Sequence, residues 1–160
     1  MPDTKEGMFG IRVARQLELP SEGDITLYSA DGHPTKVAGM SNEGISGDYR
    51  SSEGVTGLSV WGTRAKWMDL FGNIGDEKIS LIICDQPKNP CYPTYWHARG
   101  YGLFSANPLG WNDFTKGEKE LNFKLKPGET VIFKYRFIIQ SGDFLSDEKM
   151  EQEFEKFSKK

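Results

Sequence analysis

The sequence is poor in the residues and long apolar runs that mark several specialised protein classes. Of its 160 residues two are cysteines, Cys84 and Cys91, too few for the disulfide framework of a small secreted domain. Two are histidines, His33 and His97, and no paired metal-ligand motif accompanies them. No apolar stretch approaches the roughly 20 residues that cross a membrane. We therefore expect no metal, no cofactor and no membrane among its partners.

Neither positive nor negative charge predominates in the sequence. Twenty basic residues against 23 acidic ones give a net charge of -3, so nucleic acid is not an expected partner. The first residues, Met-Pro-Asp-Thr-Lys-Glu-Gly, lack the apolar segment of a signal peptide. One interpretation is a cytoplasmic protein. The other is a chain that begins partway through a longer parent product, either periplasmic or secreted.

Familiar catalytic signatures are also missing from the sequence. It has no Gly-x-Ser-x-Gly turn to hold a nucleophilic serine, no phosphate-binding loop and no dinucleotide fingerprint. Any catalysis would therefore depend on a less specific set of acids, bases and cations.

What the sequence does contain is a series of short runs with strand character. These runs cover residues 8–14, 25–28, 58–70, 78–84, 121–125 and 131–139. The run 78–84 is apolar on both faces, which is typical of a central strand. The last two runs flank Lys126-Pro-Gly-Glu129, a type II turn sequence, and are expected to form a hairpin with Phe137 and Ile139 facing inward. Residues 39–57, with five glycines, are expected to form a long loop.

The C-terminal stretch has the pattern of an amphipathic helix over about residues 146–158. Ser146 can cap its N-terminus, and acidic residues follow in the first turn. Its apolar stripe, expected to dock on a sheet, consists of Met150, Phe154 and Phe157. With no alternation of strands and helices, roughly six or seven strands and one terminal helix predict an all-β fold, an antiparallel β-sandwich. The length favours a single domain over residues 1–160.

The most unusual stretch is residues 85–110, rich in proline and aromatic residues. Its middle alternates as a strand would, and one side collects phenol, imidazole and guanidinium groups. That side carries Tyr95, His97, Arg99 and Tyr101. Such a set is natural for a polar ligand site. Trp96 falls on the other side, with Ala98, and is expected to lie in the core.

Sugars present hydroxyls beside flat C–H faces, so their sites combine aromatic platforms with hydrogen-bonding groups. The candidate ligand-binding residues of this kind are Arg12, Trp61, Arg64, Tyr95, Arg99, Tyr101 and Asn107. If the site is catalytic, His97 would act as acid or base, with Glu6 or Asp85 as its carboxylate. The ligand expected is a small carbohydrate.

Two interpretations of these residues stay open. In the first, the protein modifies a sugar through His97. In the second, it is a non-catalytic glycan-binding or interaction module, inactive without a missing N-terminal half. Geometry discriminates between them. A carboxylate within hydrogen-bond reach of His97 in a pocket favours the enzyme, and a buried His97 beside an aromatic platform favours the module.

Three segments resemble one bacterial family, labelled PmoA-like or "methane oxygenase". They are residues 3–14, residues 61–67 (Trp-Gly-Thr-Arg-Ala-Lys-Trp), and residues 85–110, which include Pro93-Thr-Tyr-Trp-His-Ala-Arg-Gly. The resemblance implies a β-sandwich related to the galactose-mutarotase-like fold and an association with carbohydrate degradation. It does not imply methane oxidation, which is the work of an integral-membrane copper enzyme.

The family resemblance also concerns the length of the chain. Family members are about twice this length, with a preceding segment rich in clustered histidines, so this chain resembles the C-terminal half alone. The resemblance therefore implies a site that is only partly present, and either self-association or a partner domain that covers an exposed sheet edge or apolar face.

Overall fold

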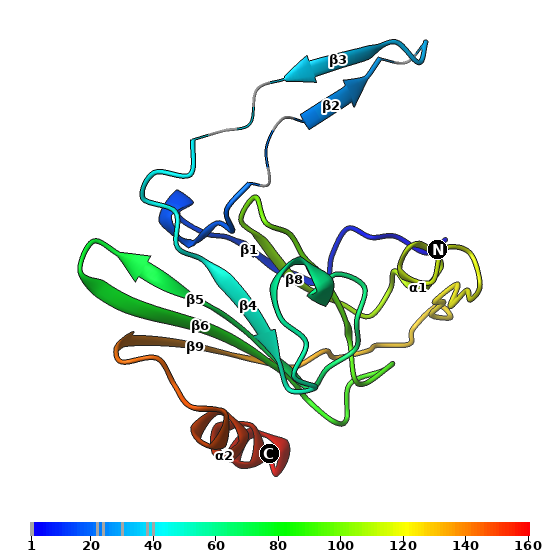
Figure 1. Cartoon of the computed structure of the whole chain (residues 1–160). Coiled ribbons are helices and arrows are strands. Elements are labelled where there is room, and N and C mark those ends of the chain that lie inside the picture. Colours follow the sequence, from blue (N-terminus) through cyan, green and yellow to red (C-terminus); the bar gives the residue numbers. More distant parts are fainter. Residues whose placement is uncertain (1, 22, 24, 30, 38, 40) are drawn as a thin grey trace.

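The computed structural model describes residues 2–21, 23, 25–29, 31–37, 39 and 41–160 (Figure 1). The strands are β1 (Phe9–Arg12), β2 (Ile25–Tyr28), β3 (Pro34–Val37), β4 (Asp48–Ser51), β5 (Trp67–Ile74), β6 (Glu77–Asp85), β7 (Tyr95–Ala98), β8 (Leu103–Asn107) and β9 (Tyr135–Gly142). The helices are α1 (Trp111–Phe114) and α2 (Asp147–Ser158), and two 3-10 turns are η1 (Arg15–Leu17) and η2 (Gly57–Val60).

The strands form two antiparallel sheets that share a core. One has the order β1-β8-β7 and the other the order β4-β5-β6-β9, while β2 and β3 make a separate hairpin (Figure 1). The inner faces meet through buried side chains of both sheets, such as Leu70 and Ile83 from one and Trp96 and Phe104 from the other. The prediction of an all-β, antiparallel sandwich with one C-terminal helix is confirmed.

The central strand is β6, as its two apolar faces predict. It pairs with β5 on one side and β9 on the other, so that Leu81 lies opposite both Leu70 and Ile139. Alternate β6 residues face the two layers: Leu81 and Ile83 contact the inner core, while Ile82 and Cys84 face α2. A strand between two apolar layers needs apolar residues at every position.

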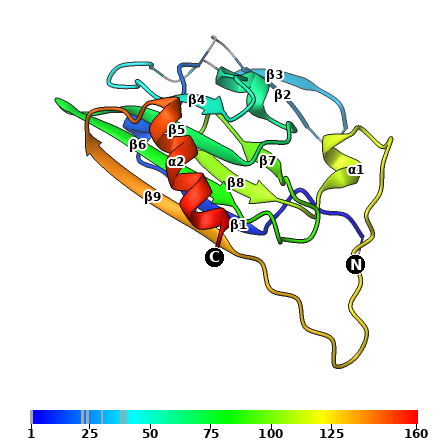
Figure 2. The same cartoon turned by 90° about the horizontal axis from the view of Figure 1, so that it is seen from below.

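Helix α2 covers the outer face of the four-stranded sheet, as Figure 2 shows from below. Ser146 is its N-cap, and the Ser146 hydroxyl accepts the Lys149 N–H at 3.3 Å. The predicted stripe is buried against the sheet side chains Trp67, Ile82 and Cys84. The predicted helix and its docking are confirmed.

Arg50 and Asp69 fasten the start of α2 to this sheet. The Asp69 side chain is fully buried, and two Arg50 nitrogens donate to its Oδ2 at 3.0 and 3.1 Å. Arg50 also donates to Asp147, in the first turn of the helix, at 3.0 Å, and to the carbonyl of Leu145, just before the helix. Burial raises the pKa of Asp69 to about 7, although the Arg50 guanidinium opposes that rise.

Two expectations in the first half of the chain are wrong. The expected loop 39–57 contains β4, whose Tyr49 is 1% exposed and pairs with Leu70. The glycines and serines around β4 leave this strand of four residues without a recognisable sequence pattern. The expected strand over 58–70 is instead η2 and a turn, with β5 beginning at Trp67. Positive φ angles of 61° at Gly57 and 71° at Gly62 break the extended conformation.

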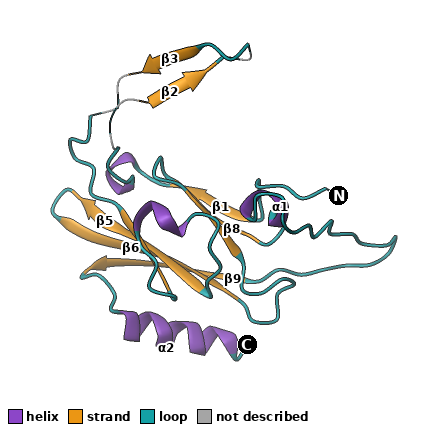
Figure 3. Cartoon of the chain, turned by 45° about the vertical axis from the view of Figure 1, so that its right-hand side comes forward, coloured by secondary structure: helices purple, strands orange, loops and turns teal. Residues whose placement is uncertain are grey.

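The expected hairpin of 121–125 with 131–139 is also wrong. The turn itself is present, because the Glu129 N–H donates to the Lys126 carbonyl at 3.0 Å and Gly128 has a φ of +86°. No strand is assigned between residues 119 and 134, however, and β9 pairs with β6. We call residues 123–133 the arm; it loops away from both sheets in Figures 2 and 3.

The inward side of β9 is only partly covered. Phe137 and Ile139 lie on the same face as the core residues Ile83 and Leu81, as predicted, but they are 37% and 67% exposed. β1, the edge strand of the three-stranded sheet, covers only the start of β9, where Phe9 stacks on Tyr135 at 5.5 Å and meets Phe137 edge-on at 6.3 Å. An apolar hollow of about 400 Å³ results, lined by Ile11, Arg12, Val13, Ala14, Leu17, Ile74, Ile79, Leu81, Phe137 and Ile139.

Candidate functional site

Strand β7 has the predicted alternation, but both of its faces are covered. Trp96 and Ala98 lie in the core between the sheets, as expected. Tyr95 and His97 lie on the outer face, where residues 3–7 and α1 cover them. Arg99 lies beyond the strand, in the turn to β8, where its N–H donates to the Leu103 carbonyl at 2.8 Å.

Segment 62–64 brings distant aromatic residues to this face. It pairs with the edge of β7: the Gly62 N–H donates to the Trp96 carbonyl at 2.9 Å, and the Trp96 N–H donates to the Thr63 carbonyl at 3.0 Å. Trp61 is thereby placed beside Phe114 of α1, with ring centroids 5.5 Å apart. Phe114 also stacks on Tyr95 at 5.3 Å and meets His97 edge-on at 6.0 Å.

Two arginines lie against these rings. The Arg99 guanidinium is 4.6 Å from the centroid of Trp61, and that of Arg64 is 5.1 Å from Tyr95 and 5.3 Å from Trp111. Cations are attracted to the faces of aromatic rings, most strongly to tryptophan. We call this set the aromatic–arginine cluster; it consists of Trp61, Arg64, Tyr95, Arg99, Trp111 and Phe114.

The two arginines differ in how many of their side-chain nitrogens are hydrogen bonded. Arg64 donates through Nε to the Pro93 carbonyl at 2.8 Å and through Nη2 to the Cys91 carbonyl at 2.9 Å, so it braces the loop before β7. Arg99 donates only through Nε, to His97 Nε2 at 3.3 Å. Within the described part of the chain, its terminal amino groups bond to no other residue and it forms no ion pair.

His97 is 3% exposed and both of its ring nitrogens are engaged. Nδ1 lies 2.7 Å from the Lys5 carbonyl, which can only accept, so Nδ1 carries the proton and Nε2 accepts from Arg99. Burial, with a smaller effect of the Arg99 charge, lowers the pKa of His97, although the bond to Lys5 opposes it. His97 is therefore neutral, and its Nε2 orients the Arg99 guanidinium by accepting a hydrogen bond from it.

Neither carboxylate proposed for catalysis is bonded to His97, although the charge of Glu6 opposes the lowering of the His97 pKa. Asp85 is 1% exposed and accepts from Asn89 Nδ2 at 2.7 Å and the Thr94 N–H at 2.8 Å. Burial raises its pKa to about 6, against these hydrogen bonds. Glu6 is exposed and follows the residue whose carbonyl holds His97. Among the described residues, neither carboxylate is hydrogen bonded or ion paired to His97.

Two other predicted residues support the structure or the rim of the site. Asn107 is fully buried; its Nδ2 donates to the Thr4 carbonyl at 2.9 Å and its Oδ1 accepts the Leu109 N–H at 2.8 Å. Arg12 is exposed, donates to the Tyr101 carbonyl at 3.2 Å, and lies 5.1 Å from the centroid of the Tyr101 ring.

Arg99 also lines a hollow of about 270 Å³, which we call the Arg99 groove. It is lined by Glu18, Leu19, Pro20, Ser21, Ile45, Leu58, Arg99, Gly100 and Tyr101. Tyr101 and Leu58 are 50% and 51% exposed, so the groove presents an aromatic and an apolar surface to solvent. Gly100 allows this close packing, because a Cβ there would lie 3.0 Å from Leu58 Cδ2.

Of the predicted ligand-binding residues, Arg99 and Tyr101 line the groove. The Trp61 ring lies against the Arg99 guanidinium, and the Arg12 guanidinium lies against the Tyr101 ring. Tyr95, Arg64 and Asn107 lie outside it. Sequence reasoning missed Glu18 and Leu58. No motif marks them, because they approach Arg99 only through tertiary contacts such as the 2.9 Å bond from the Leu19 N–H to the Gly100 carbonyl.

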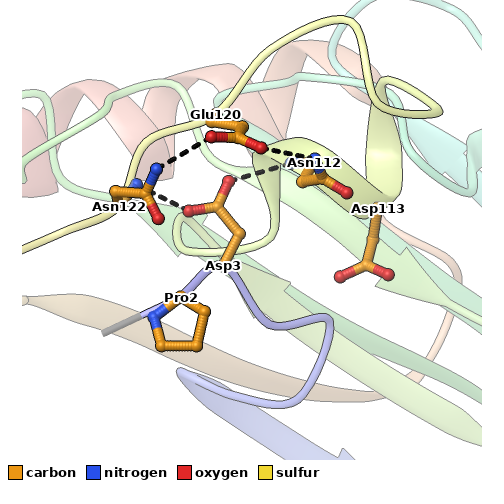
Figure 4. Close-up of a pocket in the computed structure, with 6 residues that line it drawn as sticks. All are labelled: Pro2, Asp3, Asn112, Asp113, Glu120 and Asn122. Atoms are coloured by element: carbon orange, nitrogen blue, oxygen red, sulfur yellow. Dashed lines mark hydrogen bonds between the residues drawn. The ribbon is translucent and has the colours of Figure 1, made fainter.

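A second, polar hollow of about 290 Å³ lies beside α1 (Figure 4). Its Asp3 carboxylate accepts the backbone N–H groups of Asn112, Leu121 and Asn122, which hold the pKa of Asp3 below its usual value despite partial burial. Glu120 accepts from the side-chain amides of Asn112 and Asn122. These acids therefore clamp the N-terminal segment to the chain after α1. In the described ranges no three His, Cys, Asp or Glu side chains are grouped to hold a metal ion.

The fold and the groove define a two-sheet antiparallel β protein with an arginine-bearing groove at one end of its three-stranded sheet. The chain belongs to a family of unknown function, DUF6807, whose model matches residues 1–155. No curated protein and no solved structure gives a significant match. Among the helices that the structure describes, none is long and apolar enough to cross a membrane.

Proposed function

We propose that this protein binds a carbohydrate in the Arg99 groove and recognises it without chemical conversion. The observation that carries the proposal is the state of Arg99. His97 and Trp61 hold its guanidinium in one plane, and its terminal amino groups have no acceptor among the described residues. The groove that Arg99 lines also carries the half-exposed ring of Tyr101.

The groove combines the two kinds of surface that a sugar presents. Tyr101 and Leu58 offer flat apolar area for the C–H faces, while Arg99 donates and Glu18 accepts hydrogen bonds from hydroxyl groups. Binding sites for small molecules are mostly apolar with a few well-placed polar groups. Its volume of about 270 Å³ lies just below the usual range of about 300–1,000 Å³, which suits one end of a saccharide.

Recognition is favoured over catalysis by the surroundings of His97. A general acid or base must reach the proton it transfers, either directly or through one water. His97 is buried, and its two nitrogens are bonded to Lys5 and Arg99. The enzymatic alternative, with His97 assisted by Glu6 or Asp85, would require His97 to leave one of these partners.

The test is a thermal-shift series with purified protein and a panel of mono- and disaccharides. A ligand at 100 times its dissociation constant stabilises the protein by about 2.7 kcal/mol, which raises the unfolding midpoint measurably. Arg99→Ala should abolish the shift. Arg15→Ala is the matched control, because Arg15 is exposed outside the groove and its guanidinium donates to the Ser41 carbonyl.

A shift that survives in Arg99→Ala would refute the groove as the binding site. Sugar turnover by the wild type that is lost in His97→Ala would instead support the enzymatic alternative.

We further propose that the chain is related to the PmoA-like family and to the galactose-mutarotase-like sandwiches. The resemblance to the PmoA-like family and to a galactose-mutarotase-like sandwich agrees with a carbohydrate ligand. A cytoplasmic location is proposed for the chain as given, with a periplasmic or secreted parent as the alternative.

A second candidate function, an interaction module, is favoured by the apolar hollow beside β9. Phe137 and Ile139 expose core-type side chains on the inner face of a sheet. We propose a second copy of this chain as the occupant of that face.

A further inference from the structure

We infer that the Arg99 groove selects saccharides that carry a carboxylate, that is, uronic acids or chains ending in one. The inference rests on the proposed function and names the class of sugar that this function would serve. Its grounds are the unused hydrogen-bonding capacity of Arg99 and the balance of charge around Tyr101.

Arg99 differs from the other five arginines of the chain. Arg50 and Arg136 each pair with carboxylates, whereas Arg12, Arg15 and Arg64 donate through terminal amino groups to backbone carbonyls. Arg99 alone has both terminal amino groups without an acceptor in the described part of the chain. Because Arg99 lines the groove, we assign this unused capacity to a ligand bound there.

The free side of the Arg99 guanidinium has the shape that carboxylates fit. Two parallel N–H donors in one plane bind the two oxygens of a carboxylate, and this bidentate geometry is stronger than a bond to a neutral hydroxyl. The Nε bond to His97 and the Trp61 ring fix that plane in advance. A pre-oriented side chain loses less conformational entropy when the ligand binds.

The charges around the groove favour an anion. Trp61 covers one face of the Arg99 guanidinium and keeps water from that face, so a bond from Arg99 to an anion would be less screened there. Arg12 adds a second positive charge behind the Tyr101 ring. His97 is neutral, and Glu18, the one acid among the described residues that line the groove, forms no ion pair with Arg99. Glu18 is thus available to accept from sugar hydroxyls.

The experiment is calorimetric titration of the whole chain with D-glucuronate and D-galacturonate, each compared with its neutral parent, glucose or galactose. The uronates should bind at least about tenfold more tightly, which corresponds to about 1.4 kcal/mol. Raising the salt concentration from about 50 to about 300 mM should weaken uronate binding and leave neutral-sugar binding unchanged.

Variants at Arg99 distinguish the effect of its positive charge on uronate binding from the effect of its planar pair of N–H donors. Arg99→Gln should remove the preference for uronates, because the amide can hydrogen bond but carries no charge. Arg99→Lys should keep part of the preference, because it retains the charge and loses the fork. Arg15→Gln should behave as wild type, and circular dichroism with thermal unfolding checks that each variant is folded.

The outcomes are distinguishable. Equal affinity for uronates and their neutral parents overturns this inference and leaves the proposed function standing. Absence of binding to every sugar overturns both. A uronate preference that survives in a folded Arg99→Gln variant places the site elsewhere and overturns the inference as well.

Discussion

His97 links the covered outer face of the three-stranded sheet to the Arg99 groove. Its Nε2 accepts from Arg99 Nε only while that nitrogen carries no proton. Because burial lowers the pKa of His97, this condition holds at neutral pH and fails in acid. The groove is therefore prepared for binding by a residue that does not line it.

A pH dependence of sugar binding follows. Affinity should be constant above the usual imidazole pKa of about 6.5 and should fall about tenfold as His97 becomes protonated at lower pH. His97→Gln should remove the dependence, since a glutamine amide can donate and accept without titrating. Calorimetric titrations between pH 5 and pH 8, at about 0.15 M salt, measure this. An identical acid-side loss in His97→Gln would assign the titration to another group.

Among elements, the attachment of α2 to the four-stranded sheet depends on a buried ion pair. Asp69 is fully buried, while the Arg50 side chain is 23% exposed and also reaches Asp147. Removing one partner of such a pair leaves an uncompensated charge in the interior. Arg50→Ala should therefore lower the free energy of unfolding by about 3–5 kcal/mol at pH 8, as measured by urea denaturation.

Asp69→Asn gives the companion prediction. The folded-state pKa of Asp69 is raised to about 7, so between its unfolded value of 3.8 and that value the folded protein binds more protons than the unfolded one. This contribution to stability is present in acid and is lost as the pH rises through about 7. Asp69→Asn should flatten the pH dependence of unfolding in that window. A curve parallel to that of the wild type would contradict the assignment.

The elements show what sequence patterns can and cannot predict. The strand around Leu81 and the helix with Phe154 follow from apolar periodicity, because each buries its faces against the element beside it. The strand containing Tyr49 was missed because four residues among glycines and serines carry little pattern. The expected hairpin failed because β9 pairs with β6, a choice set by tertiary packing.

The site follows the same division. The alternation of Tyr95 and His97 was predictable from their spacing, as was the placement of Trp96 in the core. The covering of that outer face by residues 3–7 and α1 was not, because no local pattern announces it. The groove likewise joins Glu18, Leu58 and Arg99 across long loops, so only the third could be singled out in advance.

At the scale of the whole molecule, the open side of the sandwich predicts self-association. Ile139 of β9 and Ile74 of β5, 67% and 39% exposed, both line the apolar hollow, and β9 and β1 are edge strands of the sheets in the described residues. Exposed apolar patches next to unpaired edges favour association with another chain. Light scattering after size-exclusion chromatography should show a dimer that forms with increasing protein concentration.

The matched variant for that test is Ile139→Lys. It should abolish the dimer and change the stability of the monomer by no more than about 0.5 kcal/mol, because the side chain is largely exposed. Lys88→Ile, at an exposed position between β6 and β7, serves as the control that leaves the patch intact. A wild-type protein that stays monomeric over the whole concentration range would exclude this mode of association.

The arm gives the chain a place where it can be opened. Its tip at Pro127 and Gly128 is exposed and belongs to no sheet, while β9 beyond it is fixed to β6 over eight register positions, Lys78↔Gly142 to Asp85↔Tyr135. Loop tips of this kind tolerate insertions and new chain ends. A peptide tag or reporter domain could therefore enter there without disturbing the Arg99 groove, and a protein cut at the tip could be reassembled from two pieces whose rejoining reports on the fold.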